Sequence, residues 1–400
     1  MKNIKILKNL VAAFFVVFIF ILSQIGEAQA QGLKAVVDPV AINEAVPLKL
    51  TGFDSVTERL LDFYLEIVGF EVTDKSPKFE LVSAKTGIGG ILYRLSGGRV
   101  KVFGETYSGS NDRAKIQTLA DRVVETIRKV KPIAKTKLVF RARTTGRGSS
   151  TSDIYICDID GGNVRRLTND KTINKDPAYN PKSGKAYYLS YMQSTARILS
   201  HSLSSGNRQN FAFFGGTSFA PSISPDGSKV AAILSRDGNP ELYVANSDGR
   251  NWKRLTKTKA PEFSPCWSPD GRTICYSSKR SGNPRLYTVN VSGGRSTELR
   301  TGGALLATEP DWSPDGKWIA FTRQTRGSFY VCVVPAKGGS HRPIVEGEDP
   351  SWSPNSRTLT FSRRLRNGSR VISMLDVPTK QVKDLNIRSL GSCSQPSWGK

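Results

Sequence analysis

The sequence predicts a multidomain chain in which a small N-terminal α/β domain precedes an all-β, six-bladed β-propeller. The prediction rests on a repeated phrase, on strand-like stretches that fill each repeat, and on an N-terminal part that lacks the phrase. The phrase reads Pro-x-aromatic-Ser-Pro-Asp-Gly, and its aromatic position, Ile in the second copy, falls at Tyr179, Ile223, Trp267, Trp312, Trp352 and Trp398. The steps are 44, 44, 45, 40 and 46 residues. A step of about 40–45 residues of strand-rich sequence is typical of a propeller with one four-stranded blade per repeat.

Residues 1–30 are predicted to be a cleaved secretory signal peptide. Three lysines precede an uninterrupted apolar run, Leu10–Leu22, and Ala28-Gln-Ala30 supplies small residues for cleavage. The run is short for a membrane span. A retained membrane anchor is the alternative, but cleavage is favoured, and the mature chain would then begin at Gln31 without stable insertion in a membrane.

Residues 31–134 are predicted to form the α/β domain, because helical and strand patterns alternate over about 100 residues. One helix is expected to begin after Asp54, and a second after Asn111. Their apolar faces are expected to contain Val56, Leu60, Leu61, Tyr64, Leu65 and Val68 in the first helix, and Ile116, Leu119, Ala120, Val123, Ile127 and Val130 in the second. Strands are expected at 33–37, 48–50, 70–72, 79–82, 91–95 and 99–103, the last two joined by Gly97-Gly98.

Residues 135–400 are predicted to form the propeller, and the two ends of this region complement each other. Lys137–Ala142 reads as the second strand of a blade that has no first strand before it. Pro396–Lys400 reads as a first strand with nothing after it. The C-terminus is therefore expected to close the ring as the inner strand of the first blade, which removes an exposed sheet edge. An open solenoid of six units is the alternative.

The charge of the chain indicates an anionic partner or surroundings. The formal net charge is +24, and removal of residues 1–30 would leave about +22. Nucleic acid is a poor candidate for a secreted chain, so no nucleic-acid partner is expected. Anionic polysaccharide, cell-wall polymer, lipid head groups or an acidic protein fit better.

The sequence gives no support for an enzyme, a metal site or a cofactor. No Gly-x-Ser-x-Gly elbow occurs, and His201 and His341, expected at exposed or edge positions, belong to no metal-like cluster. The stretch 158–163 resembles a calcium loop but lacks its terminal acid. The five cysteines follow no metal spacing. Cys266 and Cys275 are expected on neighbouring strands, where a disulfide is possible, although buried free thiols are favoured.

The order of these features resembles the TolB-like propeller family of the Tol-Pal cell-envelope system. Asp311–Phe321 (DWSPDGKWIAF), the pattern Asp153-Ile-Tyr followed by Arg166-Leu-Thr168, and the ending Gln395–Trp398 carry the resemblance. The resemblance implies a periplasmic, monomeric scaffold rather than an enzyme. It also implies a propeller that binds a peptidoglycan-associated (Pal-like) outer-membrane lipoprotein, a mature N-terminus that contacts a TolA-like inner-membrane protein, and support for membrane integrity and constriction during division.

Two partner-binding segments are therefore expected. Residues just before each repeat proline would line the mouth of the propeller channel: Asp176, Ala220, Ser264, Glu309, Asp349 and Gln395. Thr308-Glu309-Pro310 most closely resembles the family's partner-contacting loop, although the acids could instead bond local backbone and face water. The family's TolA-facing segment corresponds to Gln31, Gly32, Leu33, Lys34 and Ala35. By contrast, Asp226, Asp270 and Asp315 are expected to be turn residues, and the repeat tryptophans inter-blade core. Binding of an anionic cell-wall or surface polymer is the alternative function.

Overall fold

The computed structural model describes residues 43–400 except 144–150, 193–195, 213–217, 237 and 305. The predicted signal peptide, the strand expected at 33–37 and the segment Gln31–Ala35 lie outside the described residues. Among the described residues, no helix combines the length and apolarity that crossing a membrane requires.

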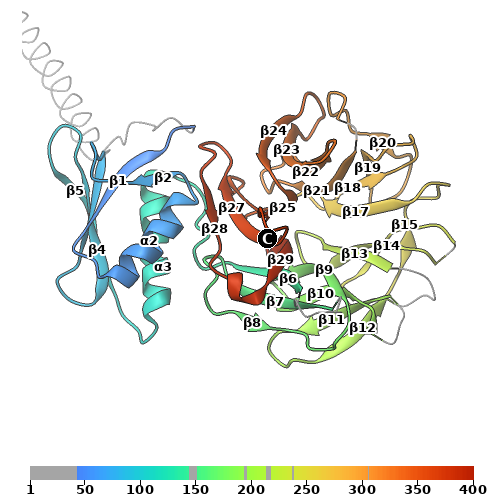
Figure 1. Cartoon of the computed structure of the whole chain (residues 1–400), viewed down its shortest axis with the longest axis horizontal. Coiled ribbons are helices and arrows are strands. Elements are labelled where there is room, and N and C mark those ends of the chain that lie inside the picture. Colours follow the sequence, from blue (N-terminus) through green and yellow to red (C-terminus); the bar gives the residue numbers. More distant parts are fainter. Residues whose placement is uncertain (1–42, 144–150, 193–195, 213–217, 237, 305) are drawn as a thin grey trace, which may run out of the picture. The chain divides into compact units, whose positions relative to one another are not determined.

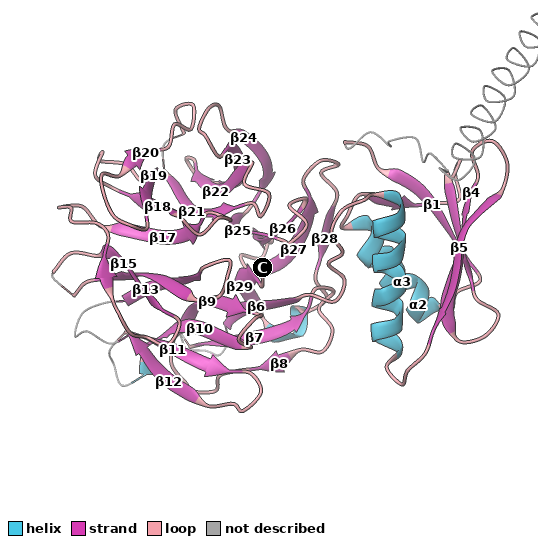
Figure 2. Ribbon diagram, turned by 180° about the vertical axis from the view of Figure 1, so that it is seen from behind, coloured by secondary structure: helices cyan, strands magenta, loops and turns pink. Residues whose placement is uncertain are grey.

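The N-terminal α/β region is a five-stranded mixed sheet with two helices lying against one of its faces (Figure 2). The strand order is β2-β1-β3-β4-β5, with β1 parallel to β2 and β3 and the remaining pairs antiparallel. The elements are β1 (Val46–Thr51), α2 (Ser55–Glu66), β2 (Phe70–Val72), β3 (Phe79–Ser83), β4 (Ile88–Arg94), β5 (Val100–Tyr107) and α3 (Asp112–Ile127).

Both helices begin where the sequence predicts. The Asp54 carboxylate accepts from the backbone N–H groups of Val56 and Thr57, and Asn111 accepts from Ala114 N–H. These are N-cap bonds that satisfy otherwise unpaired amides. The placement of Val56 on the buried face was wrong, because its side chain is 52% exposed. Thr57 takes the inward position instead, with its hydroxyl donating to Asp54 at 2.6 Å.

The described part of residues 137–398 forms six four-stranded antiparallel sheets arranged around a central axis (Figure 1). In blade order the strands are β29 (Ser392–Trp398), β6 (Lys137–Arg143), β7 (Ser152–Asp158) and β8 (Arg165–Arg166); β9 (Asn174–Asn180), β10 (Lys185–Ser190), β11 (Arg197–Ser202) and β12 (Arg208–Ala212); β13 (Ser218–Ile223), β14 (Lys229–Leu234), β15 (Glu241–Asn246) and β16 (Lys253–Arg254); β17 (Glu262–Trp267), β18 (Thr273–Ser278), β19 (Arg285–Asn290) and β20 (Thr297–Glu298); β21 (Ala307–Trp312), β22 (Trp318–Gln324), β23 (Phe329–Pro335) and β24 (Arg342–Glu346); β25 (Glu348–Trp352), β26 (Thr358–Arg364), β27 (Arg370–Asp376) and β28 (Val382–Asp384). A 3-10 turn, Arg388–Leu390, precedes β29.

The C-terminal strand closes the ring, as predicted. β29 pairs antiparallel with β6, with Cys393 opposite Ala142 and Trp398 opposite Leu138. Trp398 is 2% exposed, and its indole N–H donates to Thr136 Oγ1 at 2.8 Å. The first blade thus combines the two ends of the propeller sequence, and β29 covers the edge that β6 would otherwise leave open.

The Ser-Pro-Asp-Gly stretches form turns, as predicted. In the third blade Asp226 accepts bonds from the hydroxyl of Ser224 and from the hydroxyl and backbone N–H of Ser228. These donors stabilise the carboxylate and lower the pKa of Asp226 to about 2. Gly227 adopts a φ of 76°, which a residue with a Cβ rarely reaches.

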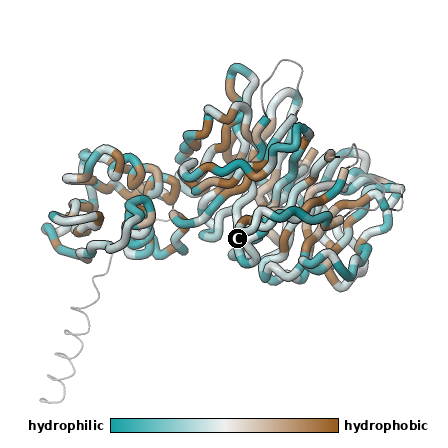
Figure 3. Tube along the Cα trace, turned by 90° about the horizontal axis from the view of Figure 1, so that it is seen from below, coloured by the Kyte–Doolittle hydropathy of each residue, from teal (hydrophilic) through white to brown (hydrophobic). Residues whose placement is uncertain are grey.

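The blades pack through apolar layers to which the repeat tryptophans contribute. Trp267 packs with residues of the preceding blade, including Ala231 and Leu242, and Trp352 packs in the same way against Ala320 and Val331. Trp312 is only partly buried in the equivalent layer. Hydrophobic and hydrophilic stretches alternate along the chain (Figure 3). The inter-blade role predicted for these tryptophans is confirmed.

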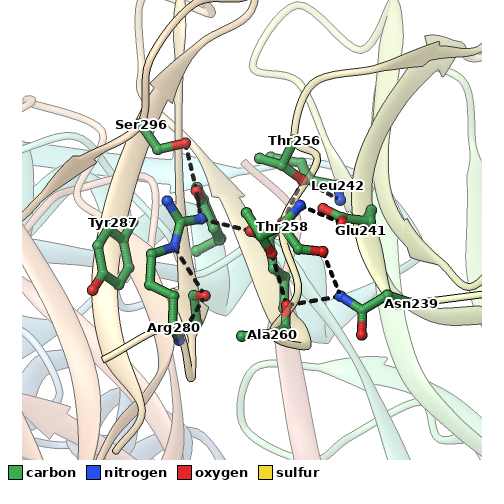
Figure 4. Close-up of polar contacts among 12 residues, drawn as sticks. Asn239, Glu241, Leu242, Thr256, Thr258, Ala260, Arg280, Tyr287 and Ser296 are labelled. Atoms are coloured by element: carbon green, nitrogen blue, oxygen red, sulfur yellow. Dashed lines mark hydrogen bonds and ion pairs between the residues drawn. The ribbon is translucent and has the colours of Figure 1, made fainter. Parts of the chain in front are cut away.

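A buried polar network lies between the third and fourth blades (Figure 4). Thr256, just after β16, accepts from Leu242 N–H at 2.9 Å and donates to the carboxylate of Glu262. Arg280 donates to the other oxygen of Glu262 at 2.6 Å and to the Tyr276 hydroxyl at 2.6 Å. Glu262 has no exposed surface, and this burial raises its pKa to about 7 in spite of the two donors.

The raised pKa of Glu262 makes the stability of the chain pH-dependent. Between its ordinary pKa of 4.5 and about 7, the folded state holds a proton that the unfolded state has lost. The stabilisation that comes from the protonated Glu262 is therefore fully present below pH 4.5 and is lost as the pH rises to about 7. We expect the free energy of unfolding of Glu262→Gln, relative to that of wild type, to rise by about 1–3 kcal/mol between pH 5 and pH 8. Urea unfolding of both proteins at a series of pH values measures this difference, and parallel pH profiles would contradict it.

Candidate functional site: the propeller channel

The channel at the centre of the ring contains a cavity of about 370 Å³, lined by the inner strands of all six blades. These strands are β9, β13, β17, β21, β25 and β29, which surround the axis in Figure 1. All six residues predicted for the channel mouth line the cavity: Asp176, Ala220, Ser264, Glu309, Asp349 and Gln395. The structure therefore brings all six residues together around one cavity.

The six mouth residues lie within the inner strands, each immediately before the repeat proline. The register between inner and second strand shifts at this point in every blade, as it does between Thr308 and Asp311. All six residues have positive φ, at 52°, 41°, 48°, 54°, 55° and 53° in sequence order. Each is an extra, left-handed residue in a β-bulge immediately before proline. Such conformations cost about 1–2 kcal/mol each in residues other than glycine, and they often occur at functional sites.

Side chains on four of the bulges accept the backbone N–H of the next bulge around the ring. Glu309 accepts from Asp349 N–H, Asp349 from Gln395 N–H, and Gln395 from Asp176 N–H, each at 3.1 Å. Asp176 continues the relay, since its carboxylate accepts from the backbone N–H of Ala220. Ala220 has no side-chain acceptor, and the relay ends there.

Hydroxyl groups of the second strands support this relay. Thr322 donates to Glu309 at 2.6 Å, and Ser362 donates to Asp349 at 2.9 Å. Sequence reasoning missed the relay. The signal was present, because a carboxylate or amide side chain recurs immediately before the repeat proline in four of the six blades.

Burial raises the pKa of Glu309, Asp349 and Asp176 above the ordinary carboxyl values. For Asp349, the nearby charge of Glu309 adds to the effect of burial. Lys175 lies 3.9 Å from Asp176. The mouth is thus an acidic, partly solvated ring in a strongly basic chain. Its carboxylate and amide oxygens can accept hydrogen bonds from basic groups or backbone amides of a protein partner.

The remaining residues singled out in the sequence do not join this site. His201 is 6% exposed in β11, so the expected exposed or edge position was wrong. His341 is partly buried and lies 2.7 Å from the carbonyl of Thr301. Asp158, in the calcium-like stretch, pairs with Lys137 and accepts from Asn163. Within the described part of the chain, no cluster of three or more His, Cys, Asp or Glu side chains is arranged to hold a metal ion.

The cysteines are free and buried, and two of them face each other. Cys266 and Cys275 are directly opposite across β17 and β18, which confirms the expected neighbouring strands. Burial raises the pKa of the Cys266 thiol, with a further contribution from Cys275. A neutral buried thiol is a poor nucleophile.

Comparisons with known proteins agree with this architecture. Residues 124–400 match the family described as "TolB beta propeller domain". The chain is 31% identical over 41% of its length to the "Tol-Pal system protein TolB" of Gluconobacter oxydans (strain 621H), covering 36% of that protein. It is 29% identical over 34% of its length to the "Protein TolB homolog" of Protochlamydia amoebophila (strain UWE25), covering 30% of that protein. Both alignments thus span only about a third of the relative.

The crystal structure of TolB from Acinetobacter baumannii superposes with a TM-score of 0.77. It is 20% identical in sequence, and the match covers 90% of this chain and 98% of that one. At this identity the likeness shows the fold, which combines a small α/β region with a six-bladed propeller. The relatives are named as TolB proteins and not as enzymes, in agreement with the expected absence of catalysis. Because the family match covers more than half of the sequence, the chain belongs to the TolB β-propeller domain family.

Proposed function

We propose that this protein is a periplasmic, non-enzymatic scaffold of the Tol-Pal envelope system, exported by a cleaved signal peptide. Its propeller mouth would bind a Pal-like, peptidoglycan-associated outer-membrane lipoprotein. Its mature N-terminal segment, Gln31–Ala35, would contact a TolA-like inner-membrane protein, so that the scaffold supports membrane integrity and constriction during division. The single observation that carries the proposal is the family membership of residues 124–400.

The channel mouth is the part of the propeller best suited to a protein partner. Its acidic groups are held in fixed positions by the relay of bulge residues, so little conformational freedom is lost when a partner binds. Glu309 is the preferred anchor, because the resemblance to the family is closest around Thr308-Glu309-Pro310. A partially solvated carboxylate at such a mouth fits an exposed Lys, Arg or backbone amide of the lipoprotein.

Two substitutions at Glu309 test the proposed mouth. Glu309→Lys reverses the charge, whereas Glu309→Gln keeps an acceptor for Thr322 and Asp349 but removes the charge. We expect Glu309→Lys to weaken binding of the lipoprotein by about 100-fold and Glu309→Gln by about tenfold, since truncating or reversing one partner of a close charged contact costs several kcal/mol. Binding of the purified proteins is measured by calorimetry.

Glu346→Lys is the matched control, because Glu346 is exposed at the end of the outer strand β24 and the charge change is the same. Thermal unfolding of each variant shows whether the propeller remains folded. If wild type and Glu309→Lys bind the lipoprotein with equal affinity, the binding face lies elsewhere on the protein. Failure of wild-type protein to bind any Pal-like lipoprotein would reject the scaffold proposal itself.

A further inference from the structure

A second hollow in the propeller, separate from the channel, lies between the third and fourth blades. Its volume is about 550 Å³, and its lining includes three cations, Lys229, Lys253 and Arg272, but no aspartate or glutamate. The amide side chains Asn246, Asn251 and Asn290 also line it. We call this feature the cationic groove.

The three cations come from different segments that the fold brings together. Lys229 begins β14 and Arg272 directly precedes β18, so each follows a Pro-Asp-Gly turn. Lys253 comes from the outer strand β16 and reaches across to the next blade, where its ammonium group donates to the carbonyl of Ser292 at 2.6 Å. The groove therefore depends on the packing of two blades and is not a property of one loop.

The charge of the cationic groove is only partly balanced by the protein around it, because the Asp270 carboxylate interacts electrostatically with Arg272. Among the described residues, no carboxylate forms an ion pair with any of its three cations, and all three residues are exposed. The closest acid in sequence, Asp270, accepts from the Ser268 hydroxyl and from the backbone N–H of Arg272. Three like charges around one hollow repel one another, and an anion between them removes that repulsion.

The amides of the groove add directional hydrogen bonds to this charge. Asn290 Oδ1 accepts from the backbone N–H of Ser292 at 2.8 Å and from its hydroxyl at 2.6 Å. Because the backbone group can only donate, these bonds fix the orientation of the amide and leave its Nδ2 donors to a ligand. Asn246 and Asn251 provide further donors and acceptors at the same hollow. Such an arrangement suits hydroxyl groups next to an anionic group.

We propose that the cationic groove binds a phosphorylated saccharide. Lys253 and Arg272 hold the phosphate with Lys229 beside them, and the asparagine amides bond the sugar hydroxyls. The volume lies within the range of about 300–1,000 Å³ that is usual for small-ligand sites. This inference is independent of the Tol-Pal role, because the groove uses outer parts of two blades and none of the channel-mouth residues.

Calorimetric titration of the purified protein with glucosamine 6-phosphate, glucosamine and inorganic phosphate tests the proposal. We expect glucosamine 6-phosphate to bind most tightly of the three. The double variant Lys253→Glu/Arg272→Glu should weaken the binding of glucosamine 6-phosphate by about tenfold or more. A loss of this size corresponds to at least one charge-assisted hydrogen bond. Asn290→Ala should weaken glucosamine 6-phosphate but leave inorganic phosphate unchanged.

The matched control is Lys337→Glu/Arg366→Glu, which makes the same charge change at two exposed positions on other blades. This control should bind glucosamine 6-phosphate with wild-type affinity. If both double variants lose affinity equally, the loss comes from the lower net charge alone, and the proposal is overturned. Absence of binding, or equal binding of phosphate and sugar phosphate, would also overturn it. Sedimentation with vesicles that carry a phosphorylated glucosamine lipid, against undoped vesicles, then distinguishes a membrane source from a soluble one. The groove variants should bind the lipoprotein normally, which separates this result from the test of the scaffold.

Discussion

Removal of residues 392–400 is expected to abolish cooperative folding of the propeller. These residues contain β29, the inner strand of the first blade, and its loss leaves β6 without a partner beside the channel. The truncation also removes Trp398, which is almost completely buried. Loss of a buried tryptophan alone costs about 3–5 kcal/mol, against a typical total stability of about 5–15 kcal/mol for a domain. Thermal unfolding followed by circular dichroism, together with size-exclusion chromatography, measures the outcome.

Two smaller changes show which part of the strand is responsible. Trp398→Ala should leave a folded propeller that is about 3–5 kcal/mol less stable, measured by urea unfolding. Removal of Lys400 alone breaks an ion pair with Asp311 at 2.7 Å and should cost about 1 kcal/mol or less. A truncated protein with the wild-type unfolding midpoint would show that ring closure does not stabilise this propeller.

Asp376→Asn is expected to destabilise the protein by about 3–5 kcal/mol, because it leaves a buried guanidinium without its counter-charge. The side chains of Arg357 and Asp376 are 6% and 0% exposed. They form a two-pronged ion pair, with distances of 2.5 Å from Nε and 2.8 Å from Nη2 to the two carboxylate oxygens. Urea unfolding at pH 7 measures the loss.

A double variant separates the contribution of the ion pair from the cost of an isolated buried charge. Arg357→Met/Asp376→Leu should be markedly more stable than Asp376→Asn, because neither charge then remains buried alone. Arg388→Met is the surface control, since Arg388 is 68% exposed and lies 3.4 Å from Asp384, and it should cost less than about 1 kcal/mol. If Asp376→Asn costs no more than Arg388→Met, the pair does not stabilise the fold.

The sequence predicted those features of the fold that depend on local pattern. Turn residues such as Asp226 and Gly227 can form few alternative structures, and the spacing of the repeats determined the number of blades. Ring closure was predictable because the first and last repeats lack complementary strands. The burial of His201 was not predictable in this way, since it depends on the packing of β11 against neighbouring strands and not on its own sequence context.

The candidate site was predicted in position but not in conformation. Residues next to the repeat prolines were identified because they recur, and they do line one cavity. A bulge cannot be read from a single strand, because it is a shift in register between two strands. The cationic groove was missed for a similar reason: Lys253 and Arg272 meet only when two blades pack, and the sequence revealed just the excess of positive charge.

Completion of the first blade by the last strand also sets the order of events during synthesis. Strand β6 begins at Lys137, yet the strand that pairs with its inner edge ends at Trp398. The first blade therefore cannot be finished before Trp398 has emerged, and the contact spans most of the propeller sequence. Until β29 pairs with β6 the ring stays open, and the chain can still pass through a narrow channel in an extended form. For a protein that crosses a membrane unfolded, a late-closing ring would delay folding until passage is complete.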